Sequence, residues 1–275
     1  MIKNWNDIRY VEIPNGDAMD DPTNMFIIGQ DPVILIDTGS MAGIETVFAA
    51  LERIGSPAVL EILLTHIHFD HGENADEIRR VTGASVRFHE LELPELADSP
   101  HAITLDEPIV EGETIEHAGY QFEAVLTPGH AAGHLAFVET TQNFGFAGDL
   151  LTGSGSSAVF PPWGDLTDYI SSMRKIAERE TNPLLPSHGD PVTNAPQALQ
   201  HFVQRRLMRE RQILELLDGA SYSAEEIRDL LYDNLPLDVL SDVTGNVILH
   251  LEKLEREDRV RRTESGGVTR FTRAS

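Results

Sequence analysis

Residues 65–72 read Thr65-His66-Ile67-His68-Phe69-Asp70-His71-Gly72 and hold four potential metal ligands within six positions. They directly follow the apolar run 59–64, which predicts a buried strand because it is too short for a helix. Side chains two positions apart point the same way from extended backbone, so His66 and His68 converge at the strand end. The stretch therefore predicts a site for a borderline-soft divalent ion such as zinc, rather than a histidine-rich surface loop.

The composition is that of a globular protein. With 275 residues, 41% of them apolar, the chain can form one large domain, or one of about 200 residues followed by a small one. No apolar run is long enough to span a membrane, and residues 1–7 lack the pattern of a signal peptide. The chain has no cysteine, which excludes disulfides, thiolate ligands and a cysteine nucleophile. We expect a cytoplasmic protein that does not bind membranes.

The net charge of −24 is distributed unevenly. Residues 1–200 carry 9 Lys and Arg against 31 Asp and Glu, whereas residues 201–275 carry 12 against 14. An acidic surface repels polyanions, so the first part of the chain argues against broad affinity for nucleic acid.

The order of predicted elements indicates two units. In residues 1–200, strand patterns and helix patterns alternate in two β-rich halves, which predicts two packed sheets with helices outside. The predicted strands are 8–13, 25–29, 33–36, 59–64, 85–89, 114–117, 120–126, 134–139, 143–147 and 184–186. The predicted helices are 43–54, a segment ending at Thr82, 90–97, 165–180 and 195–217.

Residues 201–275 have a different character. The capping box that begins at Ser223 opens a helix to Tyr232, and a second helix is predicted over 238–258. The segments 260–262 and 268–273 flank a Glu-Ser-Gly-Gly turn, which is a hairpin signal. Three helices followed by a hairpin predict a small winged-helix domain.

Three further ligand candidates follow predicted strands, each next to a glycine. They are His130, Asp149 and His188. Glycine allows the backbone to approach an ion closely or to adopt positive φ. If a sandwich brings these loops to one rim, the chain supplies seven candidate ligands, enough for two ions that share a carboxylate. The seven are His66, His68, Asp70, His71, His130, Asp149 and His188.

With these residues in place, the sequence resembles the metallo-β-lactamase-fold hydrolases, whose motif is Asp, HxHxDH, His, Asp and His in that order. The resemblance covers about residues 20–190 and implies an α+β fold, an αββα sandwich. It implies that His66, His68 and His130 hold one ion, that Asp70, His71 and His188 hold the other, and that Asp149 bridges them. It further implies that Asp37 orients the ligand loops without touching metal. The alternative for Asp37 is an ordinary Asx-turn.

Two features indicate which branch of this family the chain resembles most. True metallo-β-lactamases usually carry Cys or Ser at the position of Asp149, so the chain looks closer to the glyoxalase II and ribonuclease Z branches. The spacing after His188 and the winged-helix tail resemble the β-lactamase-like protein 2 type. One member type of that group is a single-strand endoribonuclease, and related enzymes are thioesterases that release acyl chains from polyketide carriers.

Other residues are candidates for the surroundings of the site. His134 follows His130 by four positions and either supports the ligands or has a purely structural role. The loop 152–165 follows Asp149 and is expected to overhang the metal site. Its aromatic residues Phe160 and Trp163 either line a substrate pocket or cover core.

The expected reaction is hydrolysis. Two zinc ions, or manganese or iron, would share a hydroxide and lower the pKa of bound water to about 7. This nucleophile would attack the substrate directly, oriented by Asp70 as the catalytic residue, without an acyl-enzyme. The leading hypothesis is a binuclear hydrolase of a small-molecule thioester, ester or lactone.

The main alternative is a single-strand endoribonuclease whose winged helix holds RNA. It is favoured by the arginines around the predicted hairpin: Arg259, Arg261, Arg262, Arg270 and Arg273. It is disfavoured by the net charge and by the six acidic residues of the predicted helix 238–258, which would repel phosphates. On an enzyme such a domain more often packs or dimerises, so a homodimer is a further expectation. A DNA-binding regulator without catalysis is disfavoured by the complete ligand set.

Overall fold

The computed structural model describes the chain except residues 20, 233–235, 237–239 and 275. Its first sheet has six strands in the order β1-β2-β3-β4-β5-β6. Strands β1 to β4 are antiparallel, and β4, β5 and β6 are parallel. The bounds are β1 Ile2–Trp5, β2 Ile8–Ile13, β3 Thr23–Gly29, β4 Val33–Ile36, β5 Val59–Leu63 and β6 Ser85–Arg87.

The second sheet has five strands in the order β11-β10-β9-β8-β7. Its pairs are antiparallel except β10 and β11, which run parallel. The bounds are β7 Thr114–His117, β8 Tyr120–Leu126, β9 Leu135–Glu139, β10 Gly145–Gly148 and β11 Leu184–Pro186.

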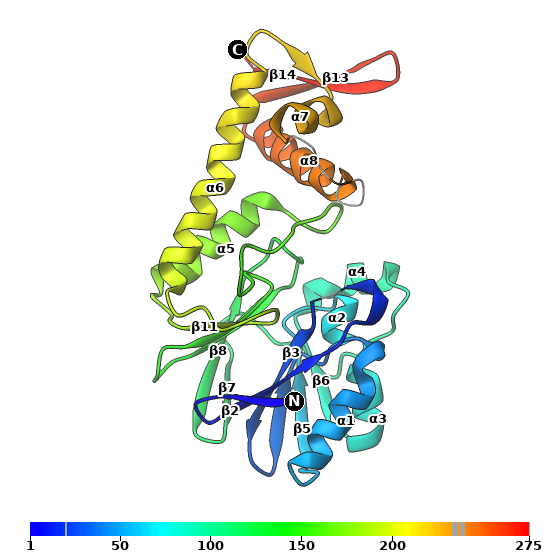
Figure 1. Ribbon diagram of the computed structural model, residues 1–275, viewed down its shortest axis with the longest axis vertical. Coiled ribbons are helices and arrows are strands. Elements are labelled where there is room, and N and C mark those ends of the chain that lie inside the picture. Colours follow the sequence, from blue (N-terminus) through cyan, green and yellow to red (C-terminus); the bar gives the residue numbers. More distant parts are fainter. Residues whose placement is uncertain (20, 233–235, 237–239, 275) are drawn as a thin grey trace.

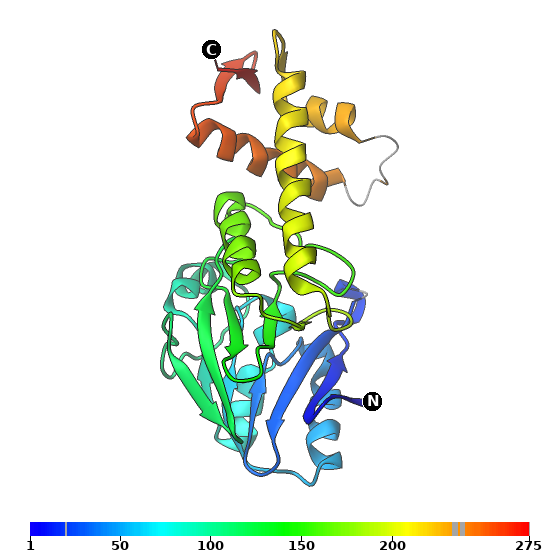
Figure 2. The same ribbon diagram turned by 90° about the vertical axis from the view of Figure 1, so that its left-hand side faces the viewer.

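Each sheet buries both faces, which explains why its central strands are apolar on both sides. In β3, Met25 and Ile27 pack in a cluster with helices α1 (Ile44–Arg53) and α3 (Ala75–Thr82). The alternate residue Phe26 faces the other sheet and contacts Phe146, with ring centroids 4.7 Å apart. Helices α5 (Leu166–Glu178) and α6 (Ala195–Leu216) pack against outward-facing side chains of the second sheet. Figure 2 shows both helices toward the upper ends of its strands. The predicted α+β class and αββα arrangement are confirmed.

The C-terminal part has the predicted winged-helix arrangement. Helix α7 (Ala224–Leu231) starts at the capping box of Ser223, and α8 (Leu240–Arg256) buries Val247, Leu251 and Leu254 in the cluster beneath a hairpin. The first two positions of the predicted helix 238–258, including Asp238, lie outside the described residues. The hairpin strands are β13 Val260–Ser265 and β14 Val268–Arg273, and the short strand β12 Ser221–Tyr222 pairs with β14.

Helix α6 belongs to both parts of the molecule (Figure 1). Its Leu199 and Val203 pack with α5 on the sandwich, whereas Ile213 and Leu214 pack in the winged-helix cluster. The domain boundary predicted between residues 200 and 201 lies inside this helix and stays a prediction.

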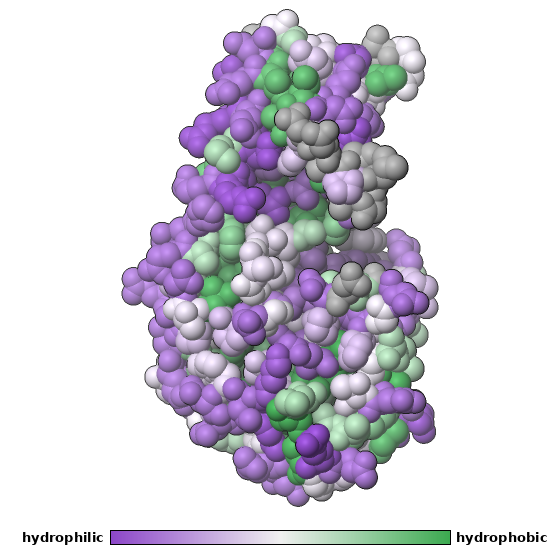
Figure 3. Space-filling view, viewed as in Figure 1, coloured by the Kyte–Doolittle hydropathy of each residue, from purple (hydrophilic) through white to green (hydrophobic). Residues whose placement is uncertain are grey.

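The remaining elements are short. They are the 3₁₀ helices Gly16–Ala18, Met41–Gly43 and Glu90–Glu92, and the helices α2 Phe69–Gly72 and α4 Leu93–Asp98. The helix predicted after the ligand stretch and up to Thr82 is confirmed as α3, which ends at Thr82 with Gly83 as its left-handed C-cap. The short helix α2 inside the ligand stretch was not predicted. None of the helices in the described ranges combines the length and apolar character needed to cross a bilayer. The face seen in Figure 3 is mostly hydrophilic.

Candidate metal centre

The seven ligand candidates come from five loops or short helices that meet at one rim of the sandwich. His66 and His68 follow β5, and Asp70 and His71 lie in α2. The other three follow strands of the second sheet: His130 follows β8, Asp149 follows β10 and His188 follows β11. Strand ends from both sheets thus bring together residues that are 122 positions apart in the sequence.

Three imidazoles form a first group of potential ligands. The Nδ1 atom of His68 lies 3.0 Å from Nε2 of His66 and 2.9 Å from Nε2 of His130. Nitrogen ligands of tetrahedral zinc are about 3.4 Å apart if each bond is about 2.1 Å long. The three nitrogens therefore have nearly the separations of a shared ion's ligands, and they can hold a metal as a group.

A second group joins a carboxylate to two imidazoles. Asp70 Oδ2 lies 3.2 Å from His188 Nε2 and 3.5 Å from His71 Nε2. The two imidazole nitrogens are 3.3 Å apart. This N₂O set also suits a borderline divalent ion.

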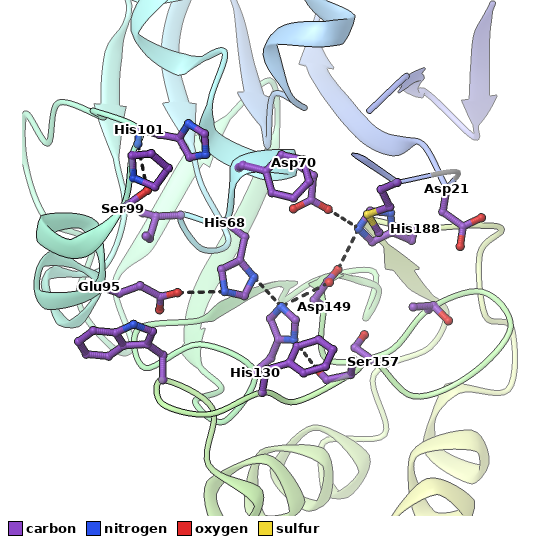
Figure 4. Close-up of a pocket in the computed structure, with 18 of the residues that line it drawn as sticks. Asp21, His68, Asp70, Glu95, Ser99, His101, His130, Asp149, Ser157 and His188 are labelled. Atoms are coloured by element: carbon purple, nitrogen blue, oxygen red, sulfur yellow. Dashed lines mark hydrogen bonds and ion pairs between the residues drawn. The ribbon is translucent and has the colours of Figure 1, made fainter. Parts of the chain in front are cut away.

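Asp149 lies between the two groups (Figure 4). Its Oδ1 atom is 3.6 Å from Nε2 of both His71 and His188, and its Oδ2 atom is 3.5 Å from Nε2 of His130. Oδ1 is buried and accepts no hydrogen bond from the described residues. A buried carboxylate oxygen without such a partner is costly, so this position fits a bridge between two cations.

The ring nitrogens that face away from the cluster are held by hydrogen bonds. Nδ1 of His130 donates to the Ala158 carbonyl at 2.7 Å, and Nδ1 of His188 donates to the Pro22 carbonyl at 3.0 Å. Each bond orients the ring and leaves the Nε2 lone pair toward the cluster. Nδ1 of His66 is likewise 3.0 Å from the Thr65 hydroxyl.

Asp37 connects three segments behind the cluster. Its fully buried carboxylate accepts hydrogen bonds from His71 Nδ1 at 2.9 Å, from the Thr65 amide at 2.8 Å and from the Ser187 hydroxyl at 2.7 Å. These partners lie 28 to 150 positions away in the sequence, unlike the local bond of an Asx-turn. The geometry matches the role of orienting ligand loops, which stays a prediction.

His134 supports the backbone of Asp149. Its Nε2 atom accepts a hydrogen bond from the Asp149 amide at 2.9 Å, and its Nδ1 atom donates to the Thr127 hydroxyl at 2.8 Å. Burial lowers the pKa of His134 to about 3, so the imidazole is neutral and can accept the bond.

Sequence reasoning missed two glutamates. Glu95 in α4 lies with Oε1 3.2 Å from Nε2 of His68, which explains why His68 turns Nδ1 toward the cluster. Glu92 is buried and accepts hydrogen bonds from the amides of Ile67, at 3.0 Å, and Gly133, so it ties two ligand segments together. Burial raises the pKa of Glu92 to about 7. Neither residue is distinguishable in sequence from the other acidic residues of 90–98.

The electrostatics of the cluster predict that metal binding depends on pH. Burial of the His71 imidazole lowers its pKa, because the charged form loses its hydration. The nearby carboxylates of Asp70, Asp149 and Asp37 have the larger, opposite effect, so the pKa of His71 lies well above the ordinary value. Burial is likewise outweighed at His188, where the hydrogen bond to Asp70 raises the pKa. Both imidazoles must lose a proton before they can bind metal. We therefore expect zinc affinity to rise with pH, by about tenfold per unit for each proton displaced, until the pH passes the raised pKa values.

Competition with a chromophoric chelator between about pH 6 and 8 measures this dependence, and calorimetry in buffers of different ionisation enthalpy counts the released protons. A zinc affinity that does not change with pH would contradict the expectation.

A cavity of about 550 Å³ opens onto the cluster. Its lining includes His68, Asp70, His130, Asp149 and His188. Phe160 and Trp163 also line it, and Phe160 is 41% exposed, so Phe160 does not cover core. Both aromatic residues thus line the cavity, and their contact with a substrate stays a prediction.

Comparison with known proteins agrees with these features. Residues 18–188 match the family described as the metallo-beta-lactamase superfamily, and residues 223–269 match the beta-lactamase associated winged helix domain. The atrochrysone carboxyl ACP thioesterase of Aspergillus fumigatus is 31% identical over 232 residues, which cover 79% of this chain and 70% of that protein.

Two further similarities extend over most of the chain. The beta-lactamase-like protein 2 homolog of Drosophila melanogaster is 27% identical over 262 residues, 88% of this chain and 85% of that protein. The crystal structure of a metallo-beta-lactamase family protein from Thermus thermophilus superposes with a TM-score of 0.82 at 24% identity and covers 98% of this chain and 99% of that one. The whole architecture, winged helix included, is thus shared.

Proposed function

Because the chain belongs to the metallo-beta-lactamase superfamily, a family of hydrolases, we propose that it cleaves a small-molecule thioester, ester or lactone with two divalent ions. The observation that carries the proposal is the position of Asp149. Its two carboxylate oxygens face different groups of potential ligands, 3.5 Å from His130 and 3.6 Å from His71 and His188. Such an arrangement suits a pair of ions that act on one substrate group.

The residues present fit two ions. His66, His68 and His130 would hold the first, Asp70, His71 and His188 would hold the second, and Asp149 would contact both. When bound, such ions polarise a carbonyl oxygen and lower the pKa of water so that it can attack at neutral pH. Zinc is the first choice for these N and O ligands, with manganese or iron as alternatives.

The residues of the chain perform the remaining tasks. Asp37, His134, Glu95 and the carbonyls of Pro22 and Ala158 hold the ligands in place. We assign to Asp70 the orientation of the attacking water, because its carboxylate also lines the cavity. The apolar walls around Trp163 hold the acyl group and exclude bulk water.

The thioester preference is supported by the relative from A. fumigatus, whose name states a thioesterase activity. Acyl transfer to water requires neither a covalent nucleophile nor a second cofactor in this arrangement. A cytoplasmic location and a homodimer remain predictions.

The ion pairs of the hairpin arginines give the endoribonuclease alternative less support than the sequence pattern does. Four of the five hairpin arginines lie in ion pairs: Arg259 with Glu257 at 3.2 Å, Arg262 with Glu255 at 3.1 Å, Arg270 with Glu226 at 2.8 Å and Arg273 with Asp218 at 3.6 Å. Arginines that are already paired have less charge to offer to phosphates.

The test is a parallel turnover assay of zinc-loaded protein with an acyl thioester, a lactone and an unstructured RNA, with D149N as the blank. We expect hydrolysis of the thioester or the lactone that is lost in D149N. RNA cleavage that disappears in D149N would reverse the ranking of the two functions. Inactivity toward all three substrates would reject the proposed substrate classes.

A further inference from the structure

The cavity at the metal centre has a large apolar wall. Its volume of about 550 Å³ is in the range of pockets that enclose a substrate with a bulky group. Apolar side chains from several segments line it: Met19, Ile67, Phe69, Pro100, Phe160 and Trp163. A substrate portion that is aromatic or aliphatic would therefore bury most of its surface here.

Apart from His101, which pairs with Glu73 at 2.9 Å, the ionisable side chains that line the cavity beyond the ligand cluster are acidic. Asp21, Glu95 and Asp98 contribute to the lining, whereas no lysine or arginine of the described chain does so. Figure 4 shows Asp21 on the side of His188 and Glu95 on the opposite side, next to His68. Glu95 is engaged by His68, but the exposed carboxylates of Asp21 and Asp98 have no side-chain hydrogen bond or ion pair among the described residues.

The metal centre does not offset this acidity. Two divalent ions would bring four positive charges, and the carboxylic groups at or directly behind the cluster are Asp37, Asp70, Glu92, Glu95 and Asp149. With neutral imidazoles the centre therefore carries no excess of positive charge. The unpaired carboxylates of Asp21 and Asp98 therefore make the electrostatic potential at the cavity negative for an approaching substrate.

We propose that the cavity selects apolar acyl substrates that are uncharged or cationic and discriminates against anionic ones, and that Asp21 and Asp98 are the residues that determine this selection. The proposal rests on the proposed hydrolase function and names its substrate class. Anionic thioesters such as those of glutathione, and phosphodiesters, would enter without a cationic partner from the cavity wall and against two free carboxylates.

The expected effect follows from screened Coulomb interactions. A carboxylate at the mouth of a solvated cavity changes the ratio of the encounter rates of a cation and an anion by about threefold at low salt. Two carboxylates acting on substrates of opposite charge should then give a preference of at least about tenfold for the cation. The preference should shrink as the ionic strength rises.

The test uses three thioesters of one phenylpropanoyl group that carry trimethylammonium, tert-butyl or carboxylate at the para position. The first two are nearly identical in shape, so they differ in charge alone. We expect kcat/KM of zinc-loaded protein to fall in the order cation, neutral, anion. In D21N/D98N the ratio of cation to anion should fall by about tenfold. The control E52Q/E178Q removes two exposed carboxylates away from the cavity and should keep the ratio of the wild type.

Binding is measured separately, with the amide analogues of the three thioesters. Trp163 lines the cavity, so its fluorescence in a W5F background reports occupancy, and Kd should follow the same order of charge. A preference for the cation that survives in D21N/D98N would assign it to a cation–π contact with Trp163 and overturn the proposal. Equal turnover of all three thioesters would also overturn it and leave the hydrolase function intact. Charge-selective binding without any turnover would instead reject the hydrolase function and retain the selection.

Discussion

Replacement of Asp149 by asparagine should lower thioester turnover by about 10³-fold and reduce the zinc content from two ions to about one per chain. Asparagine keeps the shape of the side chain but loses the negative charge and one acceptor oxygen. The carboxylate oxygens of Asp149 face His130 at 3.5 Å and both His71 and His188 at 3.6 Å, so the substitution affects both groups of ligands. Zinc content is measured by elemental analysis of the dialysed protein, and turnover by initial rates.

Two features of the structure allow an effect of D149N on the metal site to be distinguished from an effect on folding. His134 binds the backbone amide of Asp149 rather than its side chain, so the fold around the substitution is retained in D149N. Asp190 provides a matched control because it is an exposed carboxylate two positions after His188 and does not line the cavity. D190N should retain full zinc content and turnover. A D149N protein with wild-type turnover would refute the bridging role of Asp149.

Replacement of Glu210 by alanine should lower the free energy of unfolding by about 3 kcal/mol. Glu210 in α6 and Lys253 in α8 form an ion pair at 3.0 Å, and their side chains are only 3% and 7% exposed. Without Glu210, the one acidic partner that the buried ammonium group keeps among the described residues is Glu257, at 2.6 Å, whose side chain is partly exposed. His250 next to the pair cannot replace the negative charge of Glu210, because an imidazole is either neutral or cationic. Urea unfolding monitored by circular dichroism measures the change.

A double variant separates the effect of the unpaired buried charge on stability from the effect of lost side-chain packing. E210L/K253M removes both charges and keeps an apolar contact of similar volume, so its stability should lie within about 1 kcal/mol of the wild type. E215A, at an exposed position on the same helix, should leave stability unchanged. If E210A were as stable as E215A, the ion pair would not contribute to the junction between α6 and the winged helix.

Much of the fold was predictable because local patterns agree with it. Residues 59–63 of the apolar run form β5, His66 and His68 follow it, and the capping box at Ser223 opens α7. Strand β1 and the two-residue β12 were not predicted, since both are short and only partly buried. The helix predicted after the ligand stretch is α3, but the one-turn helix α2 within that stretch was not predicted because it is only four residues long.

The sequence by itself determined the order of most strands and helices, with β1, β12 and α2 as exceptions, and the seven ligand candidates, since imidazoles and carboxylates at strand ends are visible in a linear pattern. Their metal-binding roles stay predictions, although the structure brings all seven together. Only the tertiary structure decided which nitrogen of each histidine faces the cluster, that Glu95 and Glu92 support it, that arginines of the hairpin are paired, and that the cavity wall is apolar and acidic. These features depend on contacts between residues that are far apart in the chain. The local sequence around an acidic residue does not show whether that residue will make such a contact.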